Sequence, residues 1–392
     1  MKSLLACGAC IVASILLLSC APQSEAPANT GFTPPPETAP SGGGSPPGSA
    51  PAAGSLFELV NTVSVTPDDF FSGATLGYIH YVPATDHFVV MLCTHDNSET
   101  GKSVYFKEYE SEPTMAATGR RERVTYSLAD VTTTMVESTC YVIRDQPSDI
   151  EGRSYVGWFL ERFDASGIPW KKTGEVAVPV EERTEDQKYQ TGGPQVTYLG
   201  GLLDLTGEYR PQGGPPVDGQ SGTHHHFLDP NSLQVLGEKI ITSPPHCPEL
   251  SILDFNGSYH LLAASTNMGA ELLAIVFDHQ WNLQRQVVLR GSAFFPTGAA
   301  TDGERFFVAY IDRSNRSADG IRQDIRLAAY DGDWKQLADI LVQSFDVERG
   351  LQPGGPYLLL HEGHLYVSYY MDNEKVPDNV ECQVYVKVYR LF

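Results

Sequence analysis

The chain has 392 residues, of which 41% are hydrophobic and 19% charged, with a formal net charge of −21 and an isoelectric point near 4.8. This composition is typical of a globular protein with one large or two medium domains. A surface this acidic excludes nucleic acid as a partner, because phosphate contacts require Lys and Arg. It also argues against electrostatic docking on anionic lipid.

The first twenty residues, MKSLLACGACIVASILLLSC, have the single Lys and the short apolar run of a signal peptide. The run is short for a transmembrane helix. It ends in Leu17-Leu18-Ser19-Cys20, which resembles the lipobox of bacterial lipoproteins. The resemblance implies that residues 1–19 are removed and that Cys20 is acylated. Ala21 then favours the outer membrane of the cell envelope; the alternative is an ordinary secretory signal with a chance cysteine.

Residues 20–54 are dominated by Pro, Gly, Ser and Ala. Such a segment cannot bury enough apolar surface to fold. Pro extends it, while Gly and Ser keep it loose. We expect a tether that holds a folded domain, residues 55–392, away from the membrane.

Four cysteines remain after the acylated one, and their spacing matches no zinc motif. They are Cys93, Cys140, Cys247 and Cys382. An oxidising compartment permits disulfides between them, and buried free thiols are the alternative.

From Leu56 onward, short runs rich in Val, Tyr, Phe, Leu and Ile alternate with Gly, Asp, Asn and Pro turns, which predicts an all-β domain. The runs recur in units of about 45–65 residues with four strands each, the period of a β-propeller blade. We count six units. The alternatives are five or seven blades, because 113–190 is poorly delimited, or a pair of β-sandwiches.

Three details of the repeat add to this prediction, and the last of them supports a closed ring. Asn256-Gly257 and Asp302-Gly303 predict hairpin turns, because these residue types accept positive φ. Trp281 and Trp334 occupy the same place in their units, which indicates packing between neighbouring sheets. The last unit has only three strands, so we expect the strand at 56–65 to supply the fourth and remove the exposed edge.

In a propeller, inner strands begin and second strands end at one mouth of the central channel. Polar residues at these points are our candidate ligand-binding or catalytic residues: Gln195, Glu249 and Thr297 on inner strands, and Asp96, Asp145, Asn267, Asp312 and Asp372 at the ends of second strands. Such a ring can bind a cation, a sugar or a basic peptide. Asp and Asn also favour turns for backbone reasons alone.

The cadence of residues 248–261, with Pro first and Gly-x-Tyr-x-Leu at the end, is similar in kind to that of glycoside hydrolases and sialidase-like enzymes built on propellers. The resemblance implies two carboxylates flanking a glycosidic bond, with Glu249 and either Asp312 or Asp96 as candidates. The sialidase box Ser-x-Asp-x-Gly-x-Thr-Trp does not occur in the sequence. Fold alone does not give function.

The sequence THHHF at 223–227 suggests a metal site. On a strand, His224 and His226 face one way and His225 the other. Two imidazoles at this spacing can share an ion, and His246-Cys247 of the next unit are candidates for further ligands. The alternative is a solvated third strand.

We therefore expect an envelope lipoprotein whose propeller is a non-catalytic binding or scaffolding module for a protein or a glycan. The alternative is a carbohydrate-active enzyme that uses carboxylates at the channel mouth. The sequence has no dinucleotide, P-loop or serine-hydrolase motif. It requires no cofactor, although a divalent cation can be accommodated. We expect a monomer held at the membrane by its lipid.

Overall fold

The computed structural model describes residues 56–65, 74–75, 77–94, 102–127, 131–147, 155–167, 169–179, 194–209, 222–244, 246, 250–265, 271–291, 293–314, 316–317, 320–373 and 383–392. The predicted signal peptide and tether, with Cys20, lie outside these residues. Within them, no helix is long and apolar enough to cross a membrane.

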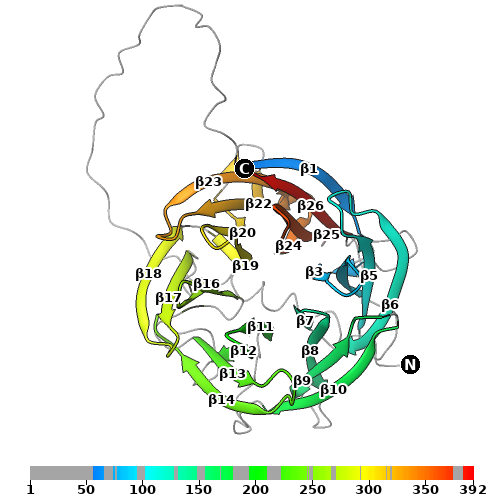
Figure 1. Ribbon diagram of the computed structural model, residues 1–392. Coiled ribbons are helices and arrows are strands. Elements are labelled where there is room, and N and C mark those ends of the chain that lie inside the picture. The colour runs from blue at the N-terminus through cyan, green and yellow to red at the C-terminus, as the bar shows by residue number, and fades with distance from the viewer. Residues whose placement is uncertain are drawn as a thin grey trace, which may run out of the picture. The chain divides into compact units, whose positions relative to one another are not determined.

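Six antiparallel sheets surround a common axis, which confirms the predicted six-bladed all-β propeller (Figure 1). Each blade runs from an inner strand to an outer strand. The first three blades consist of β2 (Ala74–Thr75), β3 (Ile79–Val82), β4 (His87–Thr94), β5 (Lys102–Glu110) and β6 (Ala117–Ser127); β7 (Val131–Val136), β8 (Thr139–Pro147), β9 (Tyr155–Asp164) and β10 (Lys171–Pro179); and β11 (Gln195–Leu199), β12 (Leu202–Tyr209), β13 (Gly222–Leu228) and β14 (Val235–Ile241).

The other three blades continue the same meander, and a short 3₁₀ helix, η1 (Val347–Arg349), precedes the sixth. They consist of β15 (Leu250–Phe255), β16 (Ser258–Ala264), β17 (Leu272–Asp278) and β18 (Leu283–Arg290); β19 (Ala293–Thr301), β20 (Phe306–Asp312), β22 (Gly320–Tyr330) and β23 (Gln336–Asp346), with the short β21 (Arg316–Ser317) beside β22; and β24 (Leu351–His361), β25 (His364–Asn373), β26 (Gln383–Leu391) and β1 (Phe57–Ser64).

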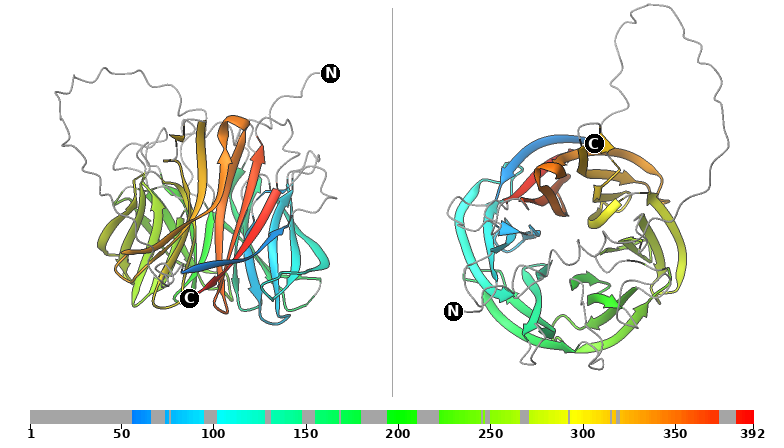
Figure 2. Two further views of the ribbon diagram at one scale, coloured as in Figure 1. Left: turned by 90° about the horizontal axis from the view of Figure 1, so that it is seen from above. Right: turned by 180° about the vertical axis from the view of Figure 1, so that it is seen from behind.

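The strand β1 closes the ring, as the sequence predicts. It pairs antiparallel with β26, starting with Phe57 opposite Leu391, and the two lie side by side in Figure 2. The Phe57 ring makes edge contacts with Phe307 of the fifth blade and with Tyr389 of β26. The last blade therefore has a complete set of four strands and no open outer edge at β26.

The core lies between neighbouring sheets. In β17 and β20 every residue but the last is buried, and a strand buried on both faces reads as an unbroken apolar run. The outer strand β14 is the opposite case, because all of its residues except the last are exposed. This gradient from the middle strands to the rim explains why the apolar runs are strongest in the middle of each unit.

The repeated Trp residues pack between blades, as predicted. Trp281 follows β17 of the fourth blade, and its ring centroid lies 4.7 Å from that of His225 in the third. Trp334 follows β22 of the fifth blade and donates its indole N–H to Nδ1 of His260 in the fourth, at 3.1 Å. Both Trp residues have left-handed backbones, with φ of 62° and 65°, so each turn directs its indole toward the preceding blade.

The two described cysteines are both buried. Neither Cys93 nor Cys140 forms a disulfide within the described part of the chain, and burial raises the pKa of the Cys140 thiol well above its ordinary value. Cys247 and Cys382 lie outside the described residues.

Candidate functional site

The end of the propeller at which inner strands begin and second strands end is called the mouth end here. Gln195 is the first residue of β11 and Asp312 is the last of β20. Thr297, Asp145 and Asp372 lie in strands of the expected type, β19, β8 and β25, but their side chains are not among those described. Asp96, Glu249 and Asn267 lie outside the described residues, so the complete ring stays a prediction.

A second carboxylate accompanies Asp312 at the mouth end. The register of β20 and β22 places Asp324 directly opposite Asp312, and directly opposed side chains in an antiparallel pair share one face with their Cβ atoms about 4.5–5.5 Å apart. Asp324 is 4% exposed and Asp312 is half-buried. Oδ1 of Asp312 accepts the backbone N–H of Ser314 at 2.7 Å. Like charges in this arrangement destabilise a sheet, which makes a functional reason for the pair worth testing.

Cationic groups lie on the same face, one step further from the mouth. Arg326 follows Asp324 by two residues, and its Nε donates to Oδ1 of Asp339 at 2.8 Å. Arg290, from the fourth blade, forms an ion pair with the same carboxylate and donates to the Tyr310 hydroxyl at 2.9 Å. Two guanidinium groups against the carboxylate of Asp339 leave an excess positive charge beside the acidic pair, which offsets part of its repulsion.

Asp324 was missed at the level of sequence because the candidates came only from inner strands and from the ends of second strands. Asp324 lies on the third strand of its blade, β22, which begins at Gly320. A signal for Asp324 was present in the sequence. Residues 324, 326 and 328 alternate with apolar Ile325 and Leu327, and such alternation indicates that the strand includes Asp324.

The third blade contains a buried polar network. Nδ1 of His225 lies 2.9 Å from Oδ2 of Asp204, and Nε2 of His225 lies 2.8 Å from the Thr223 hydroxyl. That hydroxyl is 3.0 Å from Nε2 of His246, whose Nδ1 lies 2.8 Å from the Pro244 carbonyl. The side chains of Asp204 and His225 are both fully buried.

The contacts of this network constrain the hydrogens on His246. The Pro244 carbonyl only accepts, so Nδ1 of His246 carries a hydrogen. Burial lowers the pKa of His246 to about 4, so this imidazole is neutral at pH 7 and its Nε2 accepts from the Thr223 hydroxyl. His225 and Asp204 form a buried hydrogen-bonded pair beside it.

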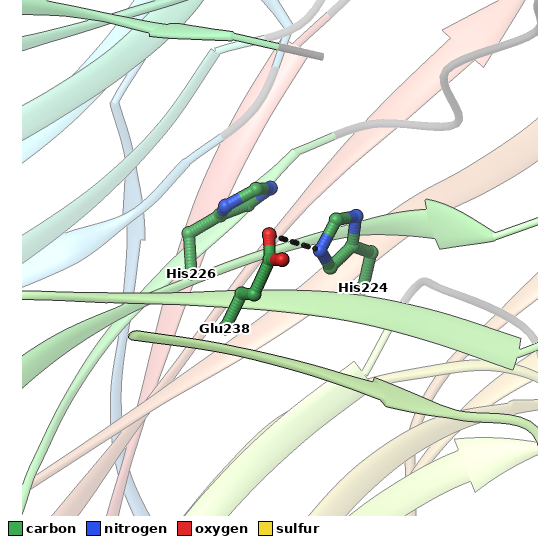
Figure 3. A group of neighbouring side chains, drawn as sticks. All are labelled: His224, His226 and Glu238. Carbon is green, nitrogen blue, oxygen red and sulfur yellow. Dashed lines mark hydrogen bonds and ion pairs between the residues drawn. The ribbon is translucent and has the colours of Figure 1, made fainter. Parts of the chain in front are cut away.

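His224 and His226 lie on the other face of β13, together with Glu238 of β14 (Figure 3). The ring centroids of the two imidazoles are 4.1 Å apart, and Nε2 of His224 is 3.2 Å from Oε2 of Glu238. Burial, followed by the nearby His224, lowers the pKa of His226 to about 4, so this imidazole is neutral at pH 7.

Two expectations about this region were wrong. The strand is not a solvated one, because β13 is buried at five of the positions from Gly222 to Leu228 and half-buried at the others. His246, expected as a further ligand of His224 and His226, lies with His225 instead. The alternation of side chains along a strand correctly predicted which of the three histidines share a face of the sheet. It could not predict which of the two faces His246 would contact.

A shallow cleft of about 500 Å³ lies at the end opposite the mouth, between the fourth and fifth blades. It is lined by the turn at Asn256, by His260 and Arg285, and by the turn from Asp331 to Asp333. Oδ1 of Asp331 accepts the backbone N–H groups of Asp333 and Lys335 at 3.0 and 2.9 Å. The acid therefore stabilises its own turn.

No known protein family and no characterised protein matches the sequence. Solved structures with a similar fold include a subtype N10 neuraminidase-like protein of an influenza A virus from a little yellow-shouldered bat, at 11% identity and a TM-score of 0.44, over 85% of this chain and 99% of that one. An alpha-L-arabinofuranosidase from Lactobacillus brevis matches at 11% identity and a TM-score of 0.46, over 66% and 90%. An endo-arabinase from Bacteroides thetaiotaomicron matches at 15% identity and 0.43, over 68% and 95%. These values describe a distant likeness of fold and assign no function.

Proposed function

We propose that the propeller is a carbohydrate-active module that binds a glycan at the mouth end and hydrolyses a glycosidic bond with Asp312 and Asp324. The single observation that supports this function is the cross-strand carboxylate pair at the end of β20 and β22. Retaining glycosidases use two carboxyl groups about 5–5.5 Å apart, one as the acid and one as the nucleophile. Directly opposed residues have Cβ atoms about 4.5–5.5 Å apart, so rotation of the two side chains can bring their carboxyl groups to that spacing.

The neighbouring charges fit this role. Arg326 and Arg290 converge on Asp339, and this cluster lies beside the acidic pair on one face of the fifth blade. A positive potential there offsets part of the repulsion between the two carboxyl groups. The distant likeness to solved carbohydrate-active enzymes adds nothing to this proposal, because the TM-scores are below 0.5.

The test is a screen of the purified protein against a panel of polysaccharides and aryl glycosides, with sugar release as the readout. We expect Asp312→Asn to lower the rate by roughly 10²–10⁴-fold, the usual contribution of an acid–base or nucleophilic group. Asp333→Asn is the matched control, because its side chain is 90% exposed and lies at the opposite end of the propeller. Hydrolysis that survives both Asp312→Asn and Asp324→Asn would reject this site.

The second candidate is a non-catalytic module that binds a protein partner on the bacterial envelope, with the chain anchored through Cys20. The observation that favours it is a set of exposed large apolar side chains on outer strands: Leu59, Leu236, Val288, Leu337 and Leu341. Exposed apolar patches mark interaction surfaces when they are contiguous. A protein that hydrolyses no glycan but is cross-linked on cells through β18 and β23 would support this candidate.

A further inference from the structure

The pair of strands β13 and β14 brings three metal-ligating side chains together on one face. His224 and His226 are two residues apart on β13, and the register places Glu238 directly opposite His226. One ligand atom from each residue lies within 4.8 Å of the other two. Figure 3 shows the Glu238 carboxylate between the two imidazoles. The three side chains therefore converge on one small volume.

The types of side chain in this group indicate a particular metal more specifically than their short separations do. Two imidazoles and one carboxylate form the ligand set of open tetrahedral zinc sites, which keep a fourth position for water. Zinc–nitrogen bonds of about 2.0–2.1 Å require ligand atoms about 3.3–3.5 Å apart. The 3.2 Å separation of His224 and Glu238 is just below this range. All three ligand atoms lie within 4.8 Å of one another, so side-chain adjustments of about 1 Å bring the set to this geometry.

The surroundings give the site a closed side and an open side. Gly207 lies opposite His224 on β12, and a side chain there would collide with the indole of Trp158 from the second blade. Trp158 is 3% exposed, so its indole fills the space over Gly207, beside His224 on the same face of the blade. The side chains of His224 and Glu238 are 12% and 67% exposed, which leaves a path for an ion from solvent.

We propose that His224, His226 and Glu238 bind one divalent metal ion of the zinc class, with a fourth coordination position open to water. Nitrogen and oxygen ligands in this ratio suit zinc, cobalt and nickel better than calcium, which prefers six or more oxygens. A bound ion joins the exposed outer strand β14 to the buried strand β13. The site lies on the flank of the third blade and is separate from the carboxylates Asp312 and Asp324.

The test uses the purified protein after treatment with a chelator, titrated with Zn²⁺ by calorimetry. We expect one strong site per chain. Glu238→Gln should weaken zinc binding by at least tenfold, and His226→Gln should abolish the strong site. Glu238 is exposed, so its variant keeps the fold even if His226→Gln does not, and a thermal melt of each variant checks this.

The matched control is His279→Gln. His279 is also an imidazole beside a carboxylate, with Nε2 3.1 Å from Oδ1 of Asp254 and a side chain 42% exposed, and it is on a turn of the fourth blade. This variant should bind zinc as the unmodified protein does. A Co²⁺ complex provides a second readout, because nitrogen and oxygen ligands give a tetrahedral visible spectrum without the thiolate charge-transfer band.

Three results would overturn the proposal. The first is no saturable binding of Zn²⁺ by the unmodified protein. The second is unchanged affinity in both Glu238→Gln and His226→Gln. The third is a thiolate band in the cobalt spectrum that disappears with a cysteine substitution, which would place the ion elsewhere. In each of these cases the three residues form only a hydrogen-bonded surface group.

Discussion

The third and fourth blades have the same architecture but different interiors. In the fourth blade, Leu262 of β16 lies opposite Ala274 of β17 in an apolar cluster. In the third blade the equivalent pair is Thr206 and His225, and His225 forms a buried hydrogen-bonded pair with Asp204. Both blades are covered on this side by an indole from the next blade, Trp281 over the third and Trp334 over the fourth. One backbone therefore tolerates two different kinds of core.

The contrast between the two interiors shows that the turns and the indoles, and not the buried side chains, specify the shape of a blade. Turns and indoles are common to both blades, whereas the buried side chains differ. A buried ion pair is weak evidence for stability, because desolvation offsets most of the attraction. A network whose hydrogen bonds are all directional fixes one arrangement of β12, β13 and the segment at His246. The apolar interior of the fourth blade gives stability without that directionality.

The largest expected effect is that of Asp204→Ala in the third blade. The substitution leaves the buried His225 imidazole without its partner, and breaking a buried pair by removing one partner costs about 3–5 kcal/mol. Urea unfolding of the full chain, followed by tryptophan fluorescence, measures this loss.

The double variant Asp204→Leu/His225→Leu sharpens the same comparison. Because it removes both polar partners together, it should be less destabilised than Asp204→Ala alone. Leu262→Ala in the fourth blade provides the apolar reference, with an expected cost of about 2–5 kcal/mol from the cavity. If the double variant were less stable than the single one, the network would be a net source of stability and the contrast between the blades would disappear.

The next effect is a loss of stability in acid through His260 of the fourth blade. Burial lowers the pKa of His260 to about 4, below its value in the unfolded chain. The folded state then binds fewer protons than the unfolded state, so this stability is present above pH 6.5 and is lost as pH falls from there toward 4. The full loss is about 3 kcal/mol.

Urea unfolding at pH 7 and at pH 4 measures this dependence. Other buried histidines contribute to the total, so the difference between the unmodified protein and His260→Gln isolates the one residue. We expect the variant to lose less stability between the two pH values, because Gln can still accept the Trp334 N–H and carries no charge. An equal loss in both proteins would mean that His260 already shares its proton with solvent in the folded state.

A smaller loss of stability is expected when either of the two Trp residues is replaced, and the loss should differ between them. Trp334→Phe removes the hydrogen bond to His260 and leaves a buried acceptor unpaired, at a cost of about 1–3 kcal/mol. Trp281→Phe in the turn above the third blade should cost about 1 kcal/mol, because its ring mainly contributes packing against His225 and Tyr259. Thermal melts of the two variants test the order, and the reverse order would show that the Trp281 indole is the stronger anchor.

The features predicted correctly from the sequence are those with local signals. Six units, the turn at Asn256-Gly257 and the equivalent places of Trp281 and Trp334 all recur along the chain. The closing strand was predictable because the last unit lacked a strand and a spare one stood at 56–65. Neither inference needed any knowledge of which side chains meet across a blade.

The features that could not be predicted depend on pairing between distant strands. Asp204 meets His225, and Glu238 meets His226, only because the strand registers align them. A shift of one residue in register would place each partner on the opposite face. The alternation within β13 was visible in the sequence, but the choice of partners depended on registers that no local pattern specifies.

The smallest effect tests whether the two blades really share their turns. Gly201 and Gly257 have φ values of +87° and +79°, and a Cβ atom at either would meet nothing within 4 Å. Substitution by Ala should therefore cost about 1 kcal/mol at each position from backbone strain alone. Paired urea melts of Gly201→Ala and Gly257→Ala should agree within a few tenths of a kcal/mol. A clear difference would mean that the polar interior of the third blade also constrains its inner turn, because strain at Gly201 would then reach Asp204 three residues along β12.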